Sequence, residues 1–180
     1  MRIFFNSDLT FPLSLKALTG EKLTFCLQSL SHLSCLKRIV LHKKSFSCPC
    51  HWSQINGRCF IFVAKPMTWA KAEKNCLSMG ANLASVRNIK EYRQIQGLIL
   101  AAGYETRETW IGGSDAQEDR TWLWSDGSAL RFTNWCPKQP DNLTRKQECL
   151  QMNYSAGKCW DDTECSAKKP SVCVKKSCPR

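Results

Sequence analysis

The stretch TWIGG, at residues 109–113, carries the first clue to the fold: a β-branched residue, a tryptophan and an isoleucine precede two glycines. This composition predicts a short strand. Similar segments follow it along the chain, namely TWLW at residues 121–124, ECLQMNY at 148–154 and PSVCV at 170–174. Between Gly112 and Cys149 there is little sustained periodicity, and so long an irregular stretch inside a compact domain is uncommon unless it is functional. The second half of the chain therefore predicts short strands around a functional loop region.

Upstream of this stretch the sequence predicts another strand and a helix. RCFIFVAK, residues 58–65, alternates and is rich in aromatic and β-branched residues, which favours a strand. In the following MTWAKAEKNCLSMGAN, Thr68 is positioned to cap a helix and Gly80 to end it. The apolar face of this helix comprises Trp69, Ala72, Cys76 and Met79.

A second helix is predicted in NIKEYRQIQGLILAAG. Asn88 is its N-cap, Glu91 three residues later completes a capping box, and Gly103 is positioned to end the helix. The buried stripe of this helix comprises Tyr92, Ile95 and Ile99. Two early helices, short strands on both sides and a long loop region together predict an α+β domain.

The composition is typical of one globular domain with an appendage. The chain has 180 residues, of which 43% are hydrophobic and 23% are charged. Its formal net charge of +11 is spread along the chain without a dense run of Lys or Arg. Such a spread favours a solvated surface, so nucleic acid is not predicted as a partner.

The cysteines indicate the compartment. Ten of the twelve lie between Cys48 and Cys178, and the C-x2-C pairs that zinc sites need are missing. Ten cysteines without metal-ligand spacing predict a disulfide framework, which belongs to an oxidising compartment. We therefore expect a secreted, extracellular protein.

Residues 1–47 contain no clean export signal. Asp8 and Lys16 interrupt the apolar stretch that a signal peptide needs, and no small-x-small cleavage site follows. LTFCLQSLSHLSCL, residues 23–36, is too short and too polar to span a bilayer comfortably, so no firm membrane segment is predicted. We interpret residues 1–47 as an irregular leader or extension that need not belong to the mature protein, and expect the folded domain at residues 48–178.

Several motifs in this order resemble the C-type lectin-like domain. CPCHW followed by NGRCF resembles the opening hairpin of that family, TWIGG resembles its core strand, and CWDD lies between the middle two of its four signature cysteines. Those signature positions correspond to Cys76, Cys149, Cys165 and Cys173. Within the family, TWIGGSDAQED, NWCPKQPDN and KCWDD are most similar to secreted fish lectins of the ladderlectin and nattectin type and to the related type II antifreeze proteins. The resemblance implies two helices packed on short antiparallel sheets with a long loop region, stapled by disulfides.

The resemblance also implies the disulfide pairing. The expected bridges are Cys48–Cys59, Cys76–Cys173, Cys149–Cys165 and Cys136–Cys159, the last clamping the loop at residues 136–142. Cys50 and Cys178 are left over in the domain, and two alternatives stay open for them. They either pair with each other or form bridges between chains, which would give a disulfide-linked homo-oligomer.

The loop CPKQPDN, residues 136–142, places an amide and a carboxylate on either side of a proline. The resemblance implies that Pro140 is cis and that the two side chains point the same way. It also implies a Ca²⁺ site, which takes about six to eight oxygen ligands, some of them from sugar hydroxyls. The implied calcium and sugar ligands are Gln139, Asp141, Asp161 and Asp162. The order of amide and then carboxylate (QPD) resembles the family's galactose-type motif.

Three departures weaken this sugar site. The family has a glutamate ligand where this chain has Gln147. The adjacent Glu148 would point to the opposite face of a strand. Gln147 or Glu148 is therefore a weaker candidate for the remaining calcium ligand. No aromatic residue lies between Asp141 and Cys149 to stack on a sugar. Asn142 begins a glycosylation sequon beside the ligands, whereas the sequon at Asn153 is expected to be less accessible.

Three classes of function follow. The first is a secreted lectin that binds galactose-type glycans on microbial surfaces in innate immunity. The second is an ice-binding protein of the type II antifreeze kind, or a calcium-independent protein-binding module. The third, an enzyme, is not expected, because no histidine lies beyond Trp52 and no separated acid–base pair is visible. The tryptophans at 110, 122, 124, 135 and 160 are assigned to packing rather than to a sugar platform.

Overall fold

The computed structural model describes residues 46–105, 107–176 and 178–179, all within the compact unit Ser45–Arg180. The predictions for the leader at residues 1–47 lie almost wholly outside the described residues, as do Cys26 and Cys35. The helices are α1 (Trp69–Ser78) and α2 (Ile89–Ala101). The strands are β1 (Phe46–Ser47), β2 (Ser53–Ile55), β3 (Arg58–Met67), β4 (Asn82–Leu83), β5 (Thr109–Ser114), β6 (Leu123–Trp124), β7 (Gln147–Tyr154), β8 (Cys159–Glu164), β9 (Lys169–Lys176) and β10 (Cys178–Pro179). This is the α+β fold that the sequence predicts.

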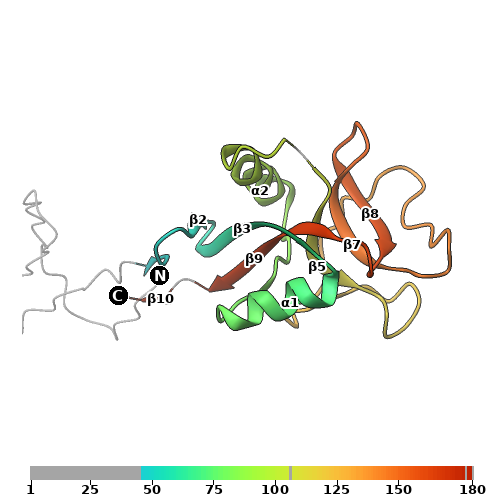
Figure 1. Ribbon diagram of the computed structural model, residues 1–180, viewed down its shortest axis with the longest axis horizontal. Coiled ribbons are helices and arrows are strands. Elements are labelled where there is room, and N and C mark those ends of the chain that lie inside the picture. Colours follow the sequence, from blue (N-terminus) through green and yellow to red (C-terminus); the bar gives the residue numbers. More distant parts are fainter. Residues whose placement is uncertain (1–45, 106, 177, 180) are drawn as a thin grey trace, which may run out of the picture. The chain divides into compact units, whose positions relative to one another are not determined.

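One eight-stranded sheet organises the domain. Its order is β2-β3-β9-β5-β7-β8, with β4 paired to β9 and β6 paired to β5, whereas β1 pairs separately with β10. The contact between β5 and β9 is parallel, at Trp110 and Ser171, and the other strand pairs are antiparallel. In Figure 1, α1 and α2 lie on opposite sides of the ribbon formed by β3 and β9. The sheet is therefore covered by a helix on each face.

The strand β5 is buried along its whole length and contributes to both cores. Trp110 packs in a cluster with Ala72 and Cys76 of α1. Its neighbour Ile111 belongs to the other cluster, which contains Tyr92 of α2. Because successive side chains of a strand point to opposite faces, one short strand serves both layers.

The two glycines that follow bring the neighbouring elements close to β5. A Cβ atom added at Gly112 would lie 2.7 Å from the carbonyl oxygen of Leu83, and one at Gly113 would lie 2.7 Å from the Cδ1 atom of Leu150. Contacts this short are essentially impossible without movement of the neighbours, so no larger residue fits either position. The TWIGG sequence thus suits a strand that is packed against neighbouring elements on both of its faces.

The start of α1 differs from the prediction for Thr68. Thr68 stands at the N-cap with an extended backbone, but its side chain makes no capping hydrogen bond. Tertiary contacts hold this end instead, since the Trp69 backbone N–H donates to the Cys165 carbonyl (3.0 Å) and its indole N–H donates to the Ile111 carbonyl (2.9 Å). At the other end, Gly80 takes a left-handed φ of 65° as the sequence predicts.

Asn88 caps the start of α2 as predicted, but the Glu91 carboxylate accepts from the Arg87 N–H instead of completing a capping box at the Asn88 N–H, and it forms a buried ion pair. Asn88 Oδ1 accepts a hydrogen bond from the Glu91 backbone N–H (2.9 Å). The Glu91 carboxylate accepts from the Arg87 backbone N–H (2.7 Å) and lies 2.7 Å from Arg58 Nη2. The Arg58 and Glu91 side chains are only 5% and 0% exposed, and Arg58 also donates to Ser85. This network ties α2 to the beginning of β3.

Four disulfides staple the sheet and helices, and their pairings are those that the resemblance implied. They are Cys48–Cys59, Cys76–Cys173, Cys136–Cys159 and Cys149–Cys165. The bridge from α1 to β9 spans 97 residues of sequence. Loop-closure entropy gives about 4–5 kcal/mol for a bridge of that length. Cys50 is exposed and forms no disulfide within the described part of the chain, and the side chain of Cys178 lies outside it, so both alternatives for these two cysteines stay predictions.

Trp160 is the centre of the aromatic packing. The rings of Tyr92, Trp124, Phe132 and Trp135 surround it, with centroids 5.5 to 6.3 Å from its own and with steep interplanar angles. Of the five tryptophans assigned to packing, Trp110, Trp124 and Trp160 are buried, and Trp122 and Trp135 are half-buried. These residues hold the core and the loops together, as the sequence predicts.

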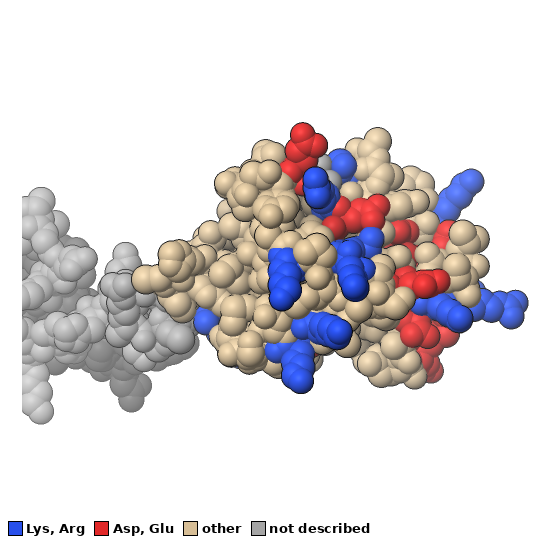
Figure 2. Space-filling model, viewed as in Figure 1, with Lys and Arg blue, Asp and Glu red and all other residues tan. Residues whose placement is uncertain are grey.

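The surface carries its charge in a dispersed form. On the face shown in Figure 2, single Lys and Arg side chains lie apart from one another, with a smaller group of Asp and Glu between them. Neither α1 nor α2, the two helices of the described residues, is long and apolar enough to cross a membrane.

The buried pair between Arg58 and Glu91 yields a stability prediction. Replacing Glu91 by Gln leaves the Arg58 guanidinium buried without a counter-charge, so the free energy of unfolding should fall by about 3–5 kcal/mol. Urea denaturation followed by tryptophan fluorescence measures this change. The matched control is Glu118→Gln, which removes the same charge from an exposed side chain and should stay within about 0.5 kcal/mol of the wild type. Equal effects of the two substitutions would contradict a structural role for the pair.

Candidate functional site

The loop at residues 136–142 lies against the beginning of β8. The Cys136–Cys159 disulfide ties its first residue to β8, and the Cys136 backbone N–H donates to the Trp160 carbonyl (2.9 Å). The peptide bond between Gln139 and Pro140 is cis. The loop is therefore held at its start by a covalent bridge and by the backbone of the strand beside it.

Asp162 fixes the far side of this loop. Its Oδ1 accepts from the Asp141 backbone N–H (3.0 Å) and its Oδ2 accepts from the Asn142 backbone N–H (2.7 Å). The Asp162 residue is fully buried. A buried carboxylate that accepts two backbone hydrogen bonds is well satisfied, and these bonds position the two loop residues on β8.

Gln139 and Asp141 lie side by side at the surface of the loop. Gln139 Nε2 donates to Asp141 Oδ2 (3.2 Å), and Gln139 Oε1 accepts from the Asp141 backbone N–H (3.1 Å). Asp141 Oδ1 also accepts from the Leu143 backbone N–H (3.1 Å). Gln139 is half-buried and Asp141 is exposed, so both side-chain oxygens are held in place within reach of a ligand.

Asp161 lies behind this pair and is buried. Its Oδ2 accepts from Gln151 Nε2 (2.6 Å) on the neighbouring strand β7. The pKa of Asp161 is raised to about 6, mainly by burial and in part by the nearby carboxylates of Asp162 and Asp141, against the lowering effect of the Gln151 hydrogen bond. The Asp161 carboxylate is thus within electrostatic range of Asp162 and Asp141, but its hydrogen bond is to β7 and not to the loop.

The two less certain ligands, Gln147 and Glu148, are separated by the structure. Gln147 Nε2 donates to the Asp162 carbonyl (3.1 Å), and Gln147 Oε1 is buried without a hydrogen-bond partner among the described residues. Glu148 lies at an irregularity in the pairing of β7 with β8, and its carbonyl accepts from the Asp115 backbone N–H (3.2 Å). Gln147 is therefore beside the loop residues, whereas only the backbone of Glu148 is engaged in the hydrogen bonds of this region.

Two residues that sequence reasoning did not assign to the site, Asp115 and Asp119, lie against it. Asn142 Nδ2 donates to Asp119 Oδ1 (3.1 Å), and Asn142 Oδ1 accepts from the Gln147 backbone N–H (3.1 Å). Burial raises the pKa of Asp115, and the nearby Asp119 and Asp162 carboxylates add to that effect. The signal in the sequence was the pair of acids in SDAQED directly after the buried strand β5.

The donor atoms of the region suit a hard cation. Within the described residues no three His, Cys, Asp or Glu side chains close around one point as a metal cage. The region instead combines the carboxylates of Asp141, Asp161 and Asp162 with the amide oxygens of Gln139 and Gln147, of which the Gln147 oxygen is buried and unpartnered. Oxygen donors in this mixture are the ligands that Ca²⁺ prefers, so the residues fit that ion.

The two glycosylation sequons differ in accessibility. The Asn153 residue is 1% exposed, and its Nδ2 donates to the Arg107 carbonyl (3.2 Å). Asn142 is half-buried, and both ends of its amide are hydrogen-bonded within the loop region. The burial of Asn153 agrees with its expected inaccessibility.

Comparisons with known proteins agree with this fold. The chain is 41% identical to a type-2 ice-structuring protein of Osmerus mordax over 133 residues, which are 74% of either protein. It is 38% identical to ladderlectin of Oncorhynchus mykiss, over 78% of this chain and 74% of ladderlectin. It is also 38% identical to the galactose-specific lectin nattectin of Thalassophryne nattereri, over 76% of this chain and 85% of nattectin. None of these names denotes an enzyme.

Solved structures and a family model point the same way. A herring type II antifreeze protein superposes with a TM-score of 0.67 at 40% identity, over 72% of this chain and 98% of that protein. A calcium-dependent type II antifreeze protein in its calcium-free form gives a TM-score of 0.66, also at 40% identity, over 72% and 100% of the two chains. The Lectin C-type domain model matches residues 65–175. The chain therefore belongs to the C-type lectin domain family.

Proposed function

We propose that this protein is a secreted, calcium-dependent lectin that binds galactose-type sugars through the loop at residues 136–142. The observation that supports this most directly is the pair of hydrogen bonds from the Asp141 and Asn142 backbone to the Asp162 carboxylate. These bonds press the loop onto β8 and leave the Gln139 and Asp141 side chains facing outward. The similarity to the galactose-specific lectin nattectin favours the same assignment.

The residues would divide the work as follows. Gln139, Asp141, Asp161, Asp162 and Gln147 would hold the ion, which supplies the positive charge that attracts two neighbouring sugar hydroxyls. The side-chain oxygens and the amide of Gln139 and Asp141 then exchange hydrogen bonds with those hydroxyls and fix their orientation. Leu143 is 79% exposed on the same loop and offers the apolar contact that an aromatic residue would otherwise make.

The wider context is part of the same proposal. The four disulfides favour an oxidising, extracellular compartment, where glycans of microbial surfaces are the natural ligands of a lectin in innate recognition. The exposed thiol of Cys50 favours a disulfide-linked homo-oligomer, which would add avidity. Asn142 is the candidate for glycosylation. A glycan attached there would project from the loop next to the ligand residues.

The proposal predicts retention on galactose-agarose in the presence of calcium and release by EDTA. Mannose-agarose is the matched column, and the order of amide and carboxylate at Gln139 and Asp141 should make it the weaker one. The double substitution Gln139→Glu with Asp141→Asn should reverse the preference for galactose over mannose. The amide and the carboxylate then change places, so the hydrogen bonds they offer suit hydroxyls in a different arrangement. Retention that EDTA does not change, or no retention together with no calcium binding, would refute the proposal and leave a calcium-independent binding module.

A second prediction concerns Gln147. Replacing it by Glu adds a negative charge at the buried, unpartnered oxygen, so calcium should bind about tenfold more tightly. The new carboxylate would also face the Asp162 carbonyl that Gln147 Nε2 now contacts, so calcium should raise the melting temperature more than in the wild type. Calorimetric titration and thermal melts with and without calcium measure both effects.

The control for this substitution is Gln94→Glu, which makes the same chemical change at an exposed position of α2. It should leave calcium affinity unchanged. Unchanged or weaker calcium binding by the Gln147→Glu variant would remove Gln147 from the ligand set.

Ice binding is the second candidate function, and the 41% identity to a type-2 ice-structuring protein favours it. The loop presents exposed charges at Arg145 and Lys146, which suit a glycan surface better than a flat, weakly charged ice face. Thermal hysteresis of the purified protein decides between the two candidates. Hysteresis without sugar retention would establish the second function in place of the first.

A further inference from the structure

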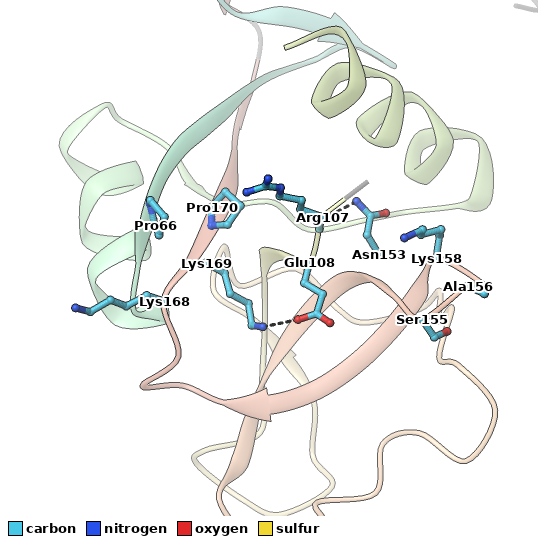
Figure 3. Close-up of a pocket in the computed structure, with 10 residues that line it drawn as sticks. All are labelled: Pro66, Arg107, Glu108, Asn153, Ser155, Ala156, Lys158, Lys168, Lys169 and Pro170. Carbon is cyan, nitrogen blue, oxygen red and sulfur yellow. Dashed lines mark hydrogen bonds and ion pairs between the residues drawn. The ribbon is translucent and has the colours of Figure 1, made fainter. Parts of the chain in front are cut away.

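A second, basic groove lies at the opposite end of β7 from Gln147. It has a volume of about 610 Å³, and its lining comes from the start of β5, the turn between β7 and β8, and the start of β9 (Figure 3). Volumes of roughly 300–1,000 Å³ are typical of sites that take small ligands. Gln147 lies at the far end of β7, whereas Cys136, the first residue of the loop at residues 136–142, lies beside the groove, since its Sγ is 3.6 Å from the Ser155 hydroxyl and is bonded to Cys159.

The charge of the groove is positive. Four basic side chains line it, and Glu108 is its single acid. Lys169 Nζ lies 2.6 Å from Glu108 Oε2 and 5.6 Å from the centroid of the Trp110 ring, so the acid is already neutralised inside the groove. Neither Arg107 nor Lys168 forms an ion pair with another described residue. The excess positive charge therefore faces the groove and its rim.

The backbone that carries these side chains is firmly held. Asn153 Nδ2 donates to the Arg107 carbonyl (3.2 Å), and the Tyr92 hydroxyl and Gln96 Nε2 both donate to the Lys158 carbonyl. Asn153, Lys158 and Ser155 have left-handed φ values of 66°, 50° and 55°, which non-glycine residues seldom adopt. A turn fixed in this way presents its side chains in a defined geometry before any ligand binds.

The shape of the groove suggests a saccharide rather than a free ion. In Figure 3 the Lys158 side chain extends toward Asn153, the Arg107 side chain extends toward Pro170, and Lys168 points to the outer edge. Pro66 and Pro170 lie at the end of the groove toward which Arg107 extends, and Ala156 and the Ser155 hydroxyl lie at the other end, beside Lys158. Apolar patches match the faces of sugar rings, and the hydroxyl matches their substituents.

We propose that this groove binds a sulfated saccharide chain, with sulfate groups held by Arg107 and Lys158 and at the rim by Lys168. The guanidinium of Arg107 offers a planar fork of donors that suits the oxygens of a sulfate ester. A sulfate ester keeps its negative charge throughout the physiological pH range, so this binding needs neither calcium nor the loop at residues 136–142. It is a site additional to the proposed function and independent of it.

The test measures binding of dextran sulfate by the full-length protein in EDTA, with unmodified dextran as the uncharged comparison. The triple variant Arg107→Gln, Lys158→Gln, Lys168→Gln should weaken binding by about 1,000-fold, since each of the three charge-assisted contacts contributes roughly tenfold. The slope of log affinity against log salt concentration should fall by about two to three. The matched control is Lys71→Gln, Lys74→Gln, Arg131→Gln, which removes the same charge from exposed positions elsewhere and should change affinity less than about threefold.

A steric variant keeps the test informative if the triple variant loses its fold. Ala156 is exposed in the groove, and Ala156→Trp fills it while leaving every charge in place, so it should also weaken binding about tenfold. Two outcomes would overturn the proposal: an equal loss of affinity in the groove triple variant and the control triple variant, or unchanged binding by the Ala156→Trp variant. Either would mean that the ligand is attracted only by the general positive charge of the protein. Equally tight binding of inorganic polyphosphate would overturn the assignment to a saccharide. Because EDTA is present throughout, failure of the calcium site leaves this result unaffected.

Discussion

The fold depends on a strand that is buried on both of its faces. β5 contributes Trp110 to the core beneath α1 and Ile111 to the core beneath α2, and its two glycines let Leu83 and Leu150 approach closely. Such a strand has no solvent face, so every residue on it is constrained at once by packing and by hydrogen bonds to its neighbours. The other elements are arranged around this constraint. Both helices, the long disulfide from α1 to β9 and the ring cluster around Trp160 close the layers on either side.

The loop at residues 136–142 obtains its geometry from the sheet rather than from its own sequence. β8 supplies the buried Asp161 and Asp162, and β7 supplies the half-buried Gln147. These residues are held in place because the two strands are paired. The loop then docks through backbone N–H groups and through the Cys136–Cys159 bridge. The part of the site that belongs to the paired strands therefore lies beneath the surface. The side chains of Gln139 and Asp141, which belong to the loop, lie on top of it. This division permits different ligands on one scaffold, in agreement with relatives that include lectins as well as ice-structuring proteins.

The sequence predicts most of the fold because its signals are local. Glycine pairs, the Asn88 cap and apolar stripes act within a few residues, and the α+β class follows from them. The Thr68 cap was wrong because contacts of Trp69 with Cys165 and Ile111, distant in sequence, hold that helix end. Short strands such as β2 and β4 carry too little pattern to be seen. The hydrogen bonds of Asp162 and the contact of Asn142 with Asp119 join segments about 20 residues apart, so no local signal announces them.

The burial of Asn153 has a consequence for biosynthesis. Its sequon is read by a glycosyltransferase that needs the amide nitrogen in the open, yet in the folded domain that nitrogen donates to the Arg107 carbonyl and the residue is 1% exposed. A glycan could be attached only before β7 closes against α2, and once attached it would keep the Tyr92 and Gln96 contacts from forming. In a compartment that carries out N-glycosylation, the sequon would set folding in competition with modification. The fraction of chains without a glycan at Asn153 would then report how quickly β7 packs against α2 during folding.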